Sequence, residues 1–480
     1  MKSTTKQIGK DSLIYGLSGV LARSIHLITL PLFTRLFTPG EYAFIDMVTV
    51  VNGFLAAAIS FGLDLAQNVY FFEEKKKGQH AQKKLVTAIF QLRLILGTAV
   101  VIICTLCFPI FNSLFFDDRL PWYYLAITFT GSLFIQISAQ SAELFRLLFK
   151  PWIASSISLV QSFGSAVVAI LMVLILDVGI FGVITGTLIG SISSAFFGWW
   201  MGRNYLDFSS LHTEWWSRLF HFGLPSIPQS FAGWFIMNLD RILIMNLLGP
   251  EAMGVYAVGI KIALIVALVL GSIKMAWFPI ALDAIQTEKG KTLLRNASCA
   301  YLGLGFTFAI MISFLSPSVI KIISTPEYFE GHLIVGIMSL FFIFDNYLSI
   351  SSLGLLKNKK TYLITAFAIV NALASLIVAY LLIPLMGILG AAVGMLFGII
   401  IRNILNQSYS ENFYHVNFEN RVMFLQFSLT LITILDLLIY GSNIYSFLLS
   451  VLSIALILIY TFQNSEIFRH LFNMVWRKAN

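Results

Sequence analysis

Residues 362–383, YLITAFAIVNALASLIVAYLLI, form a long run without a single charged side chain. An apolar helix of about 20 residues can cross the hydrocarbon core of a bilayer, because its backbone groups hydrogen-bond within the helix. Comparable runs recur along the whole chain of 480 residues. The chain is 58% hydrophobic and only 11% charged, whereas soluble domains are about 25% charged. The sequence therefore predicts an all-α integral membrane protein.

Fourteen membrane-spanning helices are predicted, and several are long enough to require tilting or kinking. They cover residues 12–33, 42–71, 85–108, 121–144, 152–174, 179–200, 219–246, 253–282, 296–316, 332–356, 362–383, 388–406, 422–440 and 444–462.

Lysine and arginine residues indicate the orientation of these spans. They concentrate in alternate loops, most densely at Lys75–Lys77 and Lys357–Lys360, whereas the other loops hold only Arg35, Arg119 and Lys321. Loops rich in Lys and Arg usually face the cytoplasm. Both termini are therefore predicted to be cytoplasmic. The first span lacks a small-residue cleavage site and is expected to remain as an uncleaved helix.

The second half of the chain repeats features of the first. With a four-residue gap, Tyr15-Gly16-Leu17 aligns with Phe222-Gly223-Leu224, and Thr38-Pro39 aligns with Gly249-Pro250. Parallel repeats are a transporter architecture in which the substrate binds between the two halves. The predicted organisation is an N-terminal six-helix lobe at 1–200, a cytoplasmic linker at 201–218, a C-terminal six-helix lobe at 219–406, an additional helix pair at 422–462 and a cytoplasmic tail at 463–480.

Residues 30–42, LPLFTRLFTPGEY, resemble the N-terminal signature of bacterial polysaccharide (O-antigen type) flippases. These proteins belong to the multidrug/oligosaccharidyl-lipid/polysaccharide exporter superfamily. The second half is similar again at Gly223-Leu224-Pro225, Asp240-Arg241 and Gly254-Val255-Tyr256, while Ala43 stands where the family usually has glycine. The resemblance implies two six-helix lobes in the bacterial cytoplasmic (inner) membrane, alternating access, and a polyprenyl-diphosphate-linked oligosaccharide as cargo.

Ionised side chains inside the predicted spans indicate where this cargo would bind. Each costs about 2.5–3.5 kcal/mol at the centre of a bilayer and therefore needs a partner or water. Basic groups in a hydrated cavity supply countercharge for a diphosphate, and amide groups bind sugar hydroxyls. On an ideal helix Lys261 and Lys274 project about 220° apart, so one of them is structural unless the helix bends. The predicted substrate-binding residues are Arg23, Lys261, Lys274, Arg93, Gln136 and Gln140.

Polar stripes on two predicted spans favour such a cavity. Asp46 and Asp64 lie 18 residues apart, five turns of one ideal helix, and therefore point the same way. Gln136 and Gln140 lie one turn apart on the span at 121–144. Packing of small and polar residues between helices is the alternative explanation.

Two deep carboxylates and two prolines suggest how transport is driven and gated. Asp64 and Asp345 are predicted to couple transport to H⁺ or Na⁺, and the alternative is a static salt bridge to a deep Lys or Arg. Pro225 and Pro228 are predicted to break the span at 219–246. Asp240 with Arg241 and Arg35 are predicted to have structural or gating roles.

Several functions are excluded or left as alternatives. The basic residues lie in short loops, so nucleic acid is not an expected partner. The sequence has no P-loop, and no catalytic residue, metal site or cofactor is predicted. Expected partners are the lipid-linked saccharide, membrane lipids, and polysaccharide polymerase or assembly proteins. The alternatives are a multidrug/cation antiporter of the same superfamily, a peptidoglycan-precursor flippase, and a membrane-embedded glycosyltransferase or polymerase. The last would need an extended outer loop, and all predicted outer loops are short.

Overall fold

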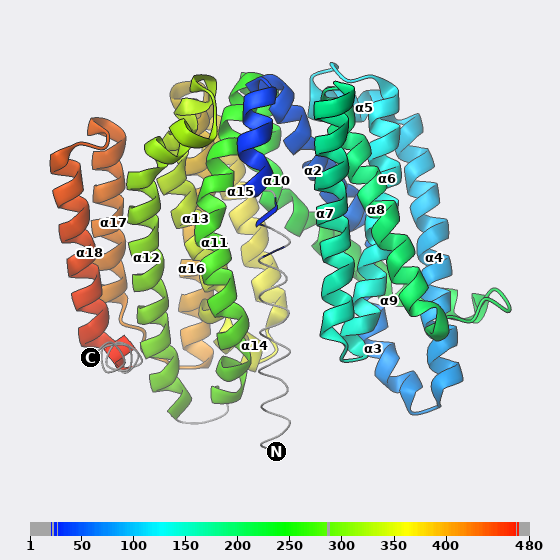
Figure 1. Ribbon diagram of the computed structural model, residues 1–480. Coiled ribbons are helices and arrows are strands. Elements are labelled where there is room, and N and C mark those ends of the chain that lie inside the picture. Colours follow the sequence, from blue (N-terminus) through cyan, green and yellow to red (C-terminus); the bar gives the residue numbers. More distant parts are fainter. Residues whose placement is uncertain (1–20, 22–23, 26, 286–288, 467, 470–480) are drawn as a thin grey trace, which may run out of the picture. The chain divides into compact units, whose positions relative to one another are not determined.

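The computed structural model describes residues 21, 24, 25, 27–285, 289–466, 468 and 469. All regular elements in these residues are helices, which confirms the predicted all-α class (Figure 1). Internal contacts divide the chain into two compact units, unit 1 at Met1–Gly254 and unit 2 at Val255–Asn480. Residues 219–254, which the sequence repeat assigns to the second lobe, fall within unit 1.

The number of membrane spans agrees approximately with the predicted fourteen. Twelve helices in the described part of the chain are long and apolar enough to cross a membrane. The helix Trp122–Leu147, predicted as a span, is not among them although it has 26 residues. Of the first predicted span, residues 27–33 belong to a shorter apolar helix at Leu27–Leu36.

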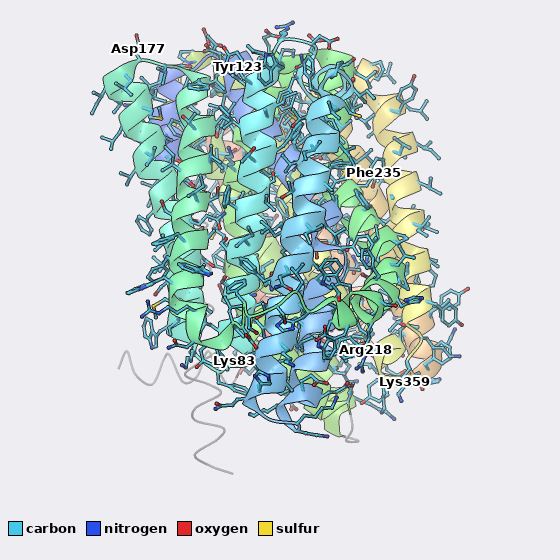
Figure 2. The ribbon with its side chains drawn as sticks, turned by 90° about the vertical axis from the view of Figure 1, so that its right-hand side faces the viewer. Lys83, Tyr123, Asp177, Arg218, Phe235 and Lys359 are labelled. Carbon is cyan, nitrogen blue, oxygen red and sulfur yellow. The ribbon has the colours of Figure 1, made fainter. Side chains whose placement is uncertain are left out.

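Unit 1 is a bundle in which α6 packs against α2, α4, α7 and α8, and α2 also packs against α10. Figure 2 shows Lys83 and Arg218 at one end of its helices and Tyr123 and Asp177 at the other. Its elements are α2 (Pro39–Ser60), α3 (Leu63–Lys75), α4 (Gln79–Leu106), α5 (Phe108–Phe116), α6 (Trp122–Leu147), α7 (Pro151–Leu176), α8 (Ile180–Gly202), η1 (Arg203–Tyr205), η2 (Thr213–Trp215), α9 (Trp216–Gly223), η3 (Leu224–Ser226) and α10 (Ile227–Leu248).

Two predicted spans of unit 1 are interrupted. The span at 42–71 divides into α2 and α3, because Phe61 (φ 46°) and Gly62 (φ 68°) adopt the left-handed conformation. Close packing explains the glycine, since a Cβ at Gly62 would lie 2.8 Å from Cα of Gly223. The single ideal helix used to align Asp46 with Asp64 is therefore not formed.

The second interruption falls where proline predicted it. The chain leaves α9 at Gly223, passes through η3, which contains Pro225, and enters α10 with Pro228 in its first turn. Proline removes a backbone donor and clashes with the preceding turn of a helix, so a break at these residues follows from their chemistry. A gating role for this break stays a prediction.

In unit 2, α12 packs against α13, α17 and α18, and Figure 1 shows α17 and α18 side by side. Hydrogen bonds tie the added pair together, from Gln426 Nε2 to Thr461 Oγ1 (3.0 Å) and from Thr433 Oγ1 to Ser453 Oγ (2.8 Å). After α11 (Pro250–Ala284), which crosses the unit boundary, the elements are α12 (Lys289–Ile323), η4 (Pro326–Gly331), α13 (His332–Ser351), α14 (Leu353–Lys357), α15 (Thr361–Met386), α16 (Ile388–Phe413), α17 (Asn420–Tyr440) and α18 (Ile444–Asn464).

The hairpins α7–α8 and α15–α16 share one glycine pattern. Gly179 precedes α8 with φ 58° and ψ −139°, and Gly387 precedes α16 with φ 58° and ψ −136°. About two turns further on, a Cβ at Gly186 would lie 2.6 Å from the backbone N of Ala169. A Cβ at Gly394 would lie 2.6 Å from the backbone N of Ala379. Small residues let helix backbones approach closely in membranes. The internal repeat therefore extends to these hairpins.

Candidate transport site

A buried arginine and a partly exposed aspartate form an ion pair inside unit 1. Arg93 lies about midway along α4 with a fully buried side chain, and its Nη2 contacts Asp64 Oδ1 at 2.6 Å. Its Nη1 donates to the backbone oxygen of Gln136 (2.8 Å), and Ser60 Oγ donates to Asp64 Oδ2 (2.8 Å). These four residues are called the N-terminal charge cluster. Its two charges cancel, which is how a buried arginine is tolerated.

The Asp64 side chain nevertheless remains 39% exposed. The two interpretations of Asp64 from the sequence, ion coupling and a salt bridge to a deep cation, are therefore compatible with the same geometry. The carboxylate is paired with Arg93 and partly exposed, and a role in ion coupling stays a prediction.

Unsatisfied amide groups lie near this cluster. Gln67 and Gln140 are buried, with 0% and 2% exposure. Neither Nε2 nor Oε1 of the Gln67 side chain has a hydrogen-bond partner among the described residues. The same is true of Gln140 Oε1 and Arg93 Nε. Gln140 Nε2 donates to the backbone oxygen of Val86 at 3.5 Å. Buried polar groups are normally satisfied by protein or by ordered water, so the interior of unit 1 is polar here.

A second ion pair joins α2 to α10. Arg241 Nε lies 3.0 Å from Asp46 Oδ2, and the two side chains are only 17% and 4% exposed. Arg241 Nη1 also donates to Asn238 Oδ1 (3.0 Å), and Trp234 Nε1 donates to the backbone oxygen of Val50 (2.9 Å). Removing one partner of a buried pair leaves an uncompensated charge. This pair therefore fixes α10 against α2. The adjacent Asp240 is also buried.

Unit 2 brings together three charged side chains from three helices. Asp345 on α13 interacts electrostatically with Lys274 on α11 and Arg402 on α16. All three are partly buried. They are called the C-terminal charge cluster. The two cations and the one carboxylate give this cluster a formal net charge of +1, in contrast to the neutral cluster of unit 1.

The remaining predicted site residues are more scattered. Lys261 is partly buried on α11, and Arg35 is exposed in the segment before α2. Arg23 lies outside the described residues. The structure thus groups Arg93, Asp64 and the backbone of Gln136 in unit 1, and Lys274 with Asp345 in unit 2. Their functional roles stay predictions.

Arg402 is the residue that sequence reasoning passed over. The predicted span at 388–406 placed it near a helix end, where Lys and Arg commonly reach the membrane surface. The structure extends α16 to Phe413, which puts Arg402 about midway along that helix. The polar residues Asn403, Asn406 and Ser410 continue the helix and are buried in the structure, which shows that α16 continues beyond the apolar run.

Long apolar helices in both units, with a partly buried charge cluster inside each unit, are typical of a multi-pass membrane transporter. Residues 8–285 match the family described as "Polysaccharide biosynthesis protein", and the chain belongs to that family. No curated protein sequence matches the chain significantly.

Solved structures of membrane transporters share the fold. The chain is similar to the lipid II flippase MurJ in an inward closed conformation, with a TM-score of 0.75 and 16% identity over 96% of this chain and 100% of that one. It is also similar to a multidrug resistance MATE family transporter of the MOP superfamily in an inward-facing conformation (TM-score 0.66, 15% identity, 81% and 94% covered). A MATE transporter of Vibrio cholerae gives 0.60 at 15% identity, with 86% and 98% covered. The predicted polysaccharide family is confirmed by the family match, and these solved transporters have the same fold.

Proposed function

We propose that the protein moves a polyprenyl-diphosphate-linked oligosaccharide repeat unit from the inner to the outer leaflet of the bacterial cytoplasmic membrane. It does so by alternating access, driven by a gradient of H⁺ or Na⁺, with both termini in the cytoplasm. The observation that carries the proposal is the net positive C-terminal charge cluster in a member of the polysaccharide biosynthesis family. The similarity to a lipid II flippase supports a lipid-linked saccharide as cargo.

The chemistry of the cargo matches this cluster. A diphosphate cannot cross hydrocarbon without countercharge, and Lys274 and Arg402 together exceed the charge of Asp345. The planar guanidinium of Arg402 can bind two phosphate oxygens at once. The polyprenyl tail can stay in the bilayer, so only the charged headgroup and the sugars need a polar path. Polysaccharide polymerase or assembly proteins would receive the product at the outer leaflet.

The MATE-like fold also suits a multidrug or cation antiporter. A site for cationic drugs would be dominated by carboxylates, because a buried cation needs an opposite charge. The net charge of the C-terminal charge cluster therefore favours the anionic cargo.

The test is to delete the gene in the organism that carries it and to determine on which leaflet the lipid-linked repeat unit accumulates. We expect accumulation on the inner leaflet, relieved by the wild-type chain but not by Lys274→Gln/Arg402→Gln at equal membrane levels. Lys359→Gln, an exposed loop substitution, is the matched control and should restore export. Normal export in the deletion strain, or a change in polymer length without accumulated precursor, would contradict the proposal and favour an enzyme.

Ion coupling is tested in the same strain. Asp345→Asn should change the dependence of export on pH or on Na⁺. Wild-type export by this variant at every pH and Na⁺ concentration would identify Asp345 as a static partner of Lys274 and Arg402.

A further inference from the structure

A cavity of about 580 Å³ opens at the end of unit 1 where α3 meets α4. Its volume lies within the range of small-molecule sites, about 300–1,000 Å³. It is separate from both charge clusters. Among the described residues that line it are two lysines and several uncharged polar groups, but no Asp or Glu. The lining consists of Phe71, Lys75, Gly78, Gln79, Gln82, Lys83, Val86, Leu144, Leu148, Asn204 and Tyr205. This cavity is called the basic pocket.

The carboxylates beside the basic pocket are engaged elsewhere. Glu74 Oε1 accepts a hydrogen bond from Lys77 Nζ at 2.7 Å, and Glu73 Oε2 lies 3.3 Å from Arg218 Nη2. Lys75 and Lys83 therefore contribute positive charge to the pocket. Figure 2 places Lys83 at the same end of unit 1 as Arg218.

A third lysine, Lys150, contacts the tyrosine that lines the pocket. Lys150 Nζ donates to the Tyr205 hydroxyl at 3.0 Å and lies 5.4 Å from the centre of its ring. Because this hydroxyl accepts from Lys150, its own proton is free to be donated to an anion in the pocket. The contact also fixes the Tyr205 ring.

Hydrogen bonds to α4 hold the segment after α8, which contributes Asn204 and Tyr205 to the basic pocket. The backbone N of Asp207 donates to Thr87 Oγ1 (2.7 Å) and that of His212 donates to Gln91 Oε1 (3.1 Å). Gln91 Nε2 in turn donates to the backbone oxygen of Ser210 (3.0 Å). Both Thr87 and Gln91 belong to α4, so this segment is anchored to the helix that carries Lys83. Binding to such a preformed site loses little conformational freedom.

One side of the basic pocket is apolar, formed by Phe71, Val86 and two leucines. Beside it, Phe149 and Trp152 at the α6–α7 turn are each 67% exposed. Tryptophan is enriched at the surface of a bilayer, where its ring contacts both lipid and water. Anion-binding side chains and an apolar, lipid-facing rim thus meet at one place.

We propose that the basic pocket binds the phosphate group of a lipid headgroup at the membrane surface. Lys75 and Lys83 supply the countercharge, and Tyr205 with the neighbouring amides donates hydrogen bonds. The acyl or prenyl chains remain in the bilayer beside Phe149 and Trp152. An anionic phospholipid and a polyprenyl diphosphate present the same group, and the proposal does not depend on which cargo is transported.

The test measures equilibrium binding to the purified full-length protein in an uncharged detergent. The probes are phosphatidylglycerol, phosphatidylcholine, a polyprenyl diphosphate and inorganic pyrophosphate. Phosphatidylglycerol should bind at least about tenfold more tightly than phosphatidylcholine, a difference of about 1.4 kcal/mol. Lys75→Gln/Lys83→Gln should weaken that binding about tenfold or more. Lys76→Gln/Lys84→Gln removes the same charge from neighbouring positions outside the lining and should weaken it no more than about twofold.

Tyr205→Phe provides a second variant, since it keeps the ring and removes only the hydroxyl; it should weaken binding about two- to tenfold. Tighter binding of the polyprenyl diphosphate that is lost in Lys75→Gln/Lys83→Gln would support the proposal and identify the cargo as a source of the phosphate. Three results would overturn it: equal losses in both lysine pairs, unchanged binding in Lys75→Gln/Lys83→Gln, and inorganic pyrophosphate binding as tightly as either lipid.

Discussion

In the C-terminal charge cluster, removing the carboxylate and removing a cation should affect stability differently. Asp345→Asn leaves Lys274 and Arg402 without countercharge, whereas Lys274→Gln leaves a balanced pair of Asp345 and Arg402. An uncompensated cation within a span costs about 2.5–3.5 kcal/mol. The three side chains are partly buried, so solvent reduces this penalty. Asp345→Asn should therefore lower the free energy of unfolding by about 1–3 kcal/mol, and Lys274→Gln by less than about 0.5 kcal/mol.

The assay is equilibrium unfolding of the full-length protein in mixed micelles, applied to both single variants and to the double variant. Asp345→Asn/Lys274→Gln leaves Arg402 as the lone charge of the cluster, so it should be more stable than Asp345→Asn alone. The double-mutant cycle should give a coupling energy of about 1 kcal/mol or more, as residues in one charge network usually do. Lys359→Gln in an exposed loop serves as the control and should change nothing measurable.

Two results would refute this reasoning. If Asp345→Asn has the same free energy of unfolding as the wild type, water already screens the two cations from each other. A double variant no more stable than Asp345→Asn would mean that Lys274 does not act on Asp345 in the folded protein.

Two further predictions concern the interior of the units, one in each. Asp64→Asn removes the charge that compensates the fully buried Arg93. It should destabilise the protein by about 1.5–3 kcal/mol, the range of a hydrogen bond to a charged group. Asp64→Asn/Arg93→Gln should recover part of this loss in the same unfolding assay, and a purely additive loss would contradict the pairing. Gly398→Leu forces a side chain into Ser375 Oγ and the neighbouring backbone and should destabilise unit 2 by about 1–3 kcal/mol. Gly233→Ala, where no atom lies within 4 Å of the added Cβ, is its control and should retain or raise stability, by up to about 1 kcal/mol; equal losses in both variants would show that close packing is not the cause.

The sequence predicts much of this fold because a bilayer imposes strong constraints. The predicted spans at 362–383 and 388–406 correspond to α15 (Thr361–Met386) and to most of α16 (Ile388–Phe413). Helix ends are harder to predict when a helix extends beyond the apolar run, as α16 does. The break at Pro225 and Pro228 follows from local chemistry, whereas the break at Phe61 does not. Phenylalanine has no preference for the left-handed conformation, so tertiary packing around the following glycine determines that break.

Charge partners are less predictable than helices. Asp64 and Arg93 are 29 residues apart and belong to different helices, so no local spacing rule connects them. The same holds for Lys274, Asp345 and Arg402. The sequence contains a second sign of the internal repeat, a glycine spacing that occurs twice. It is found at Gly179-Ile180, Gly182, Gly186 and Gly190, and again at Gly387-Ile388, Gly390, Gly394 and Gly398. This pattern marks the repeat more clearly than the alignment of the two first spans.

The two charge clusters differ in a way that suits the proposed cycle. In the N-terminal charge cluster Arg93 Nη1 donates to a backbone oxygen and Nη2 pairs with Asp64, whose charge cancels that of the guanidinium, so Arg93 offers no net countercharge to an anionic headgroup. Asp64→Asn would remove this negative charge and leave Arg93 uncompensated, which gives this cluster the same net charge of +1 as the cluster of unit 2. Under the proposed function, countercharge for an anionic headgroup therefore comes from the C-terminal charge cluster.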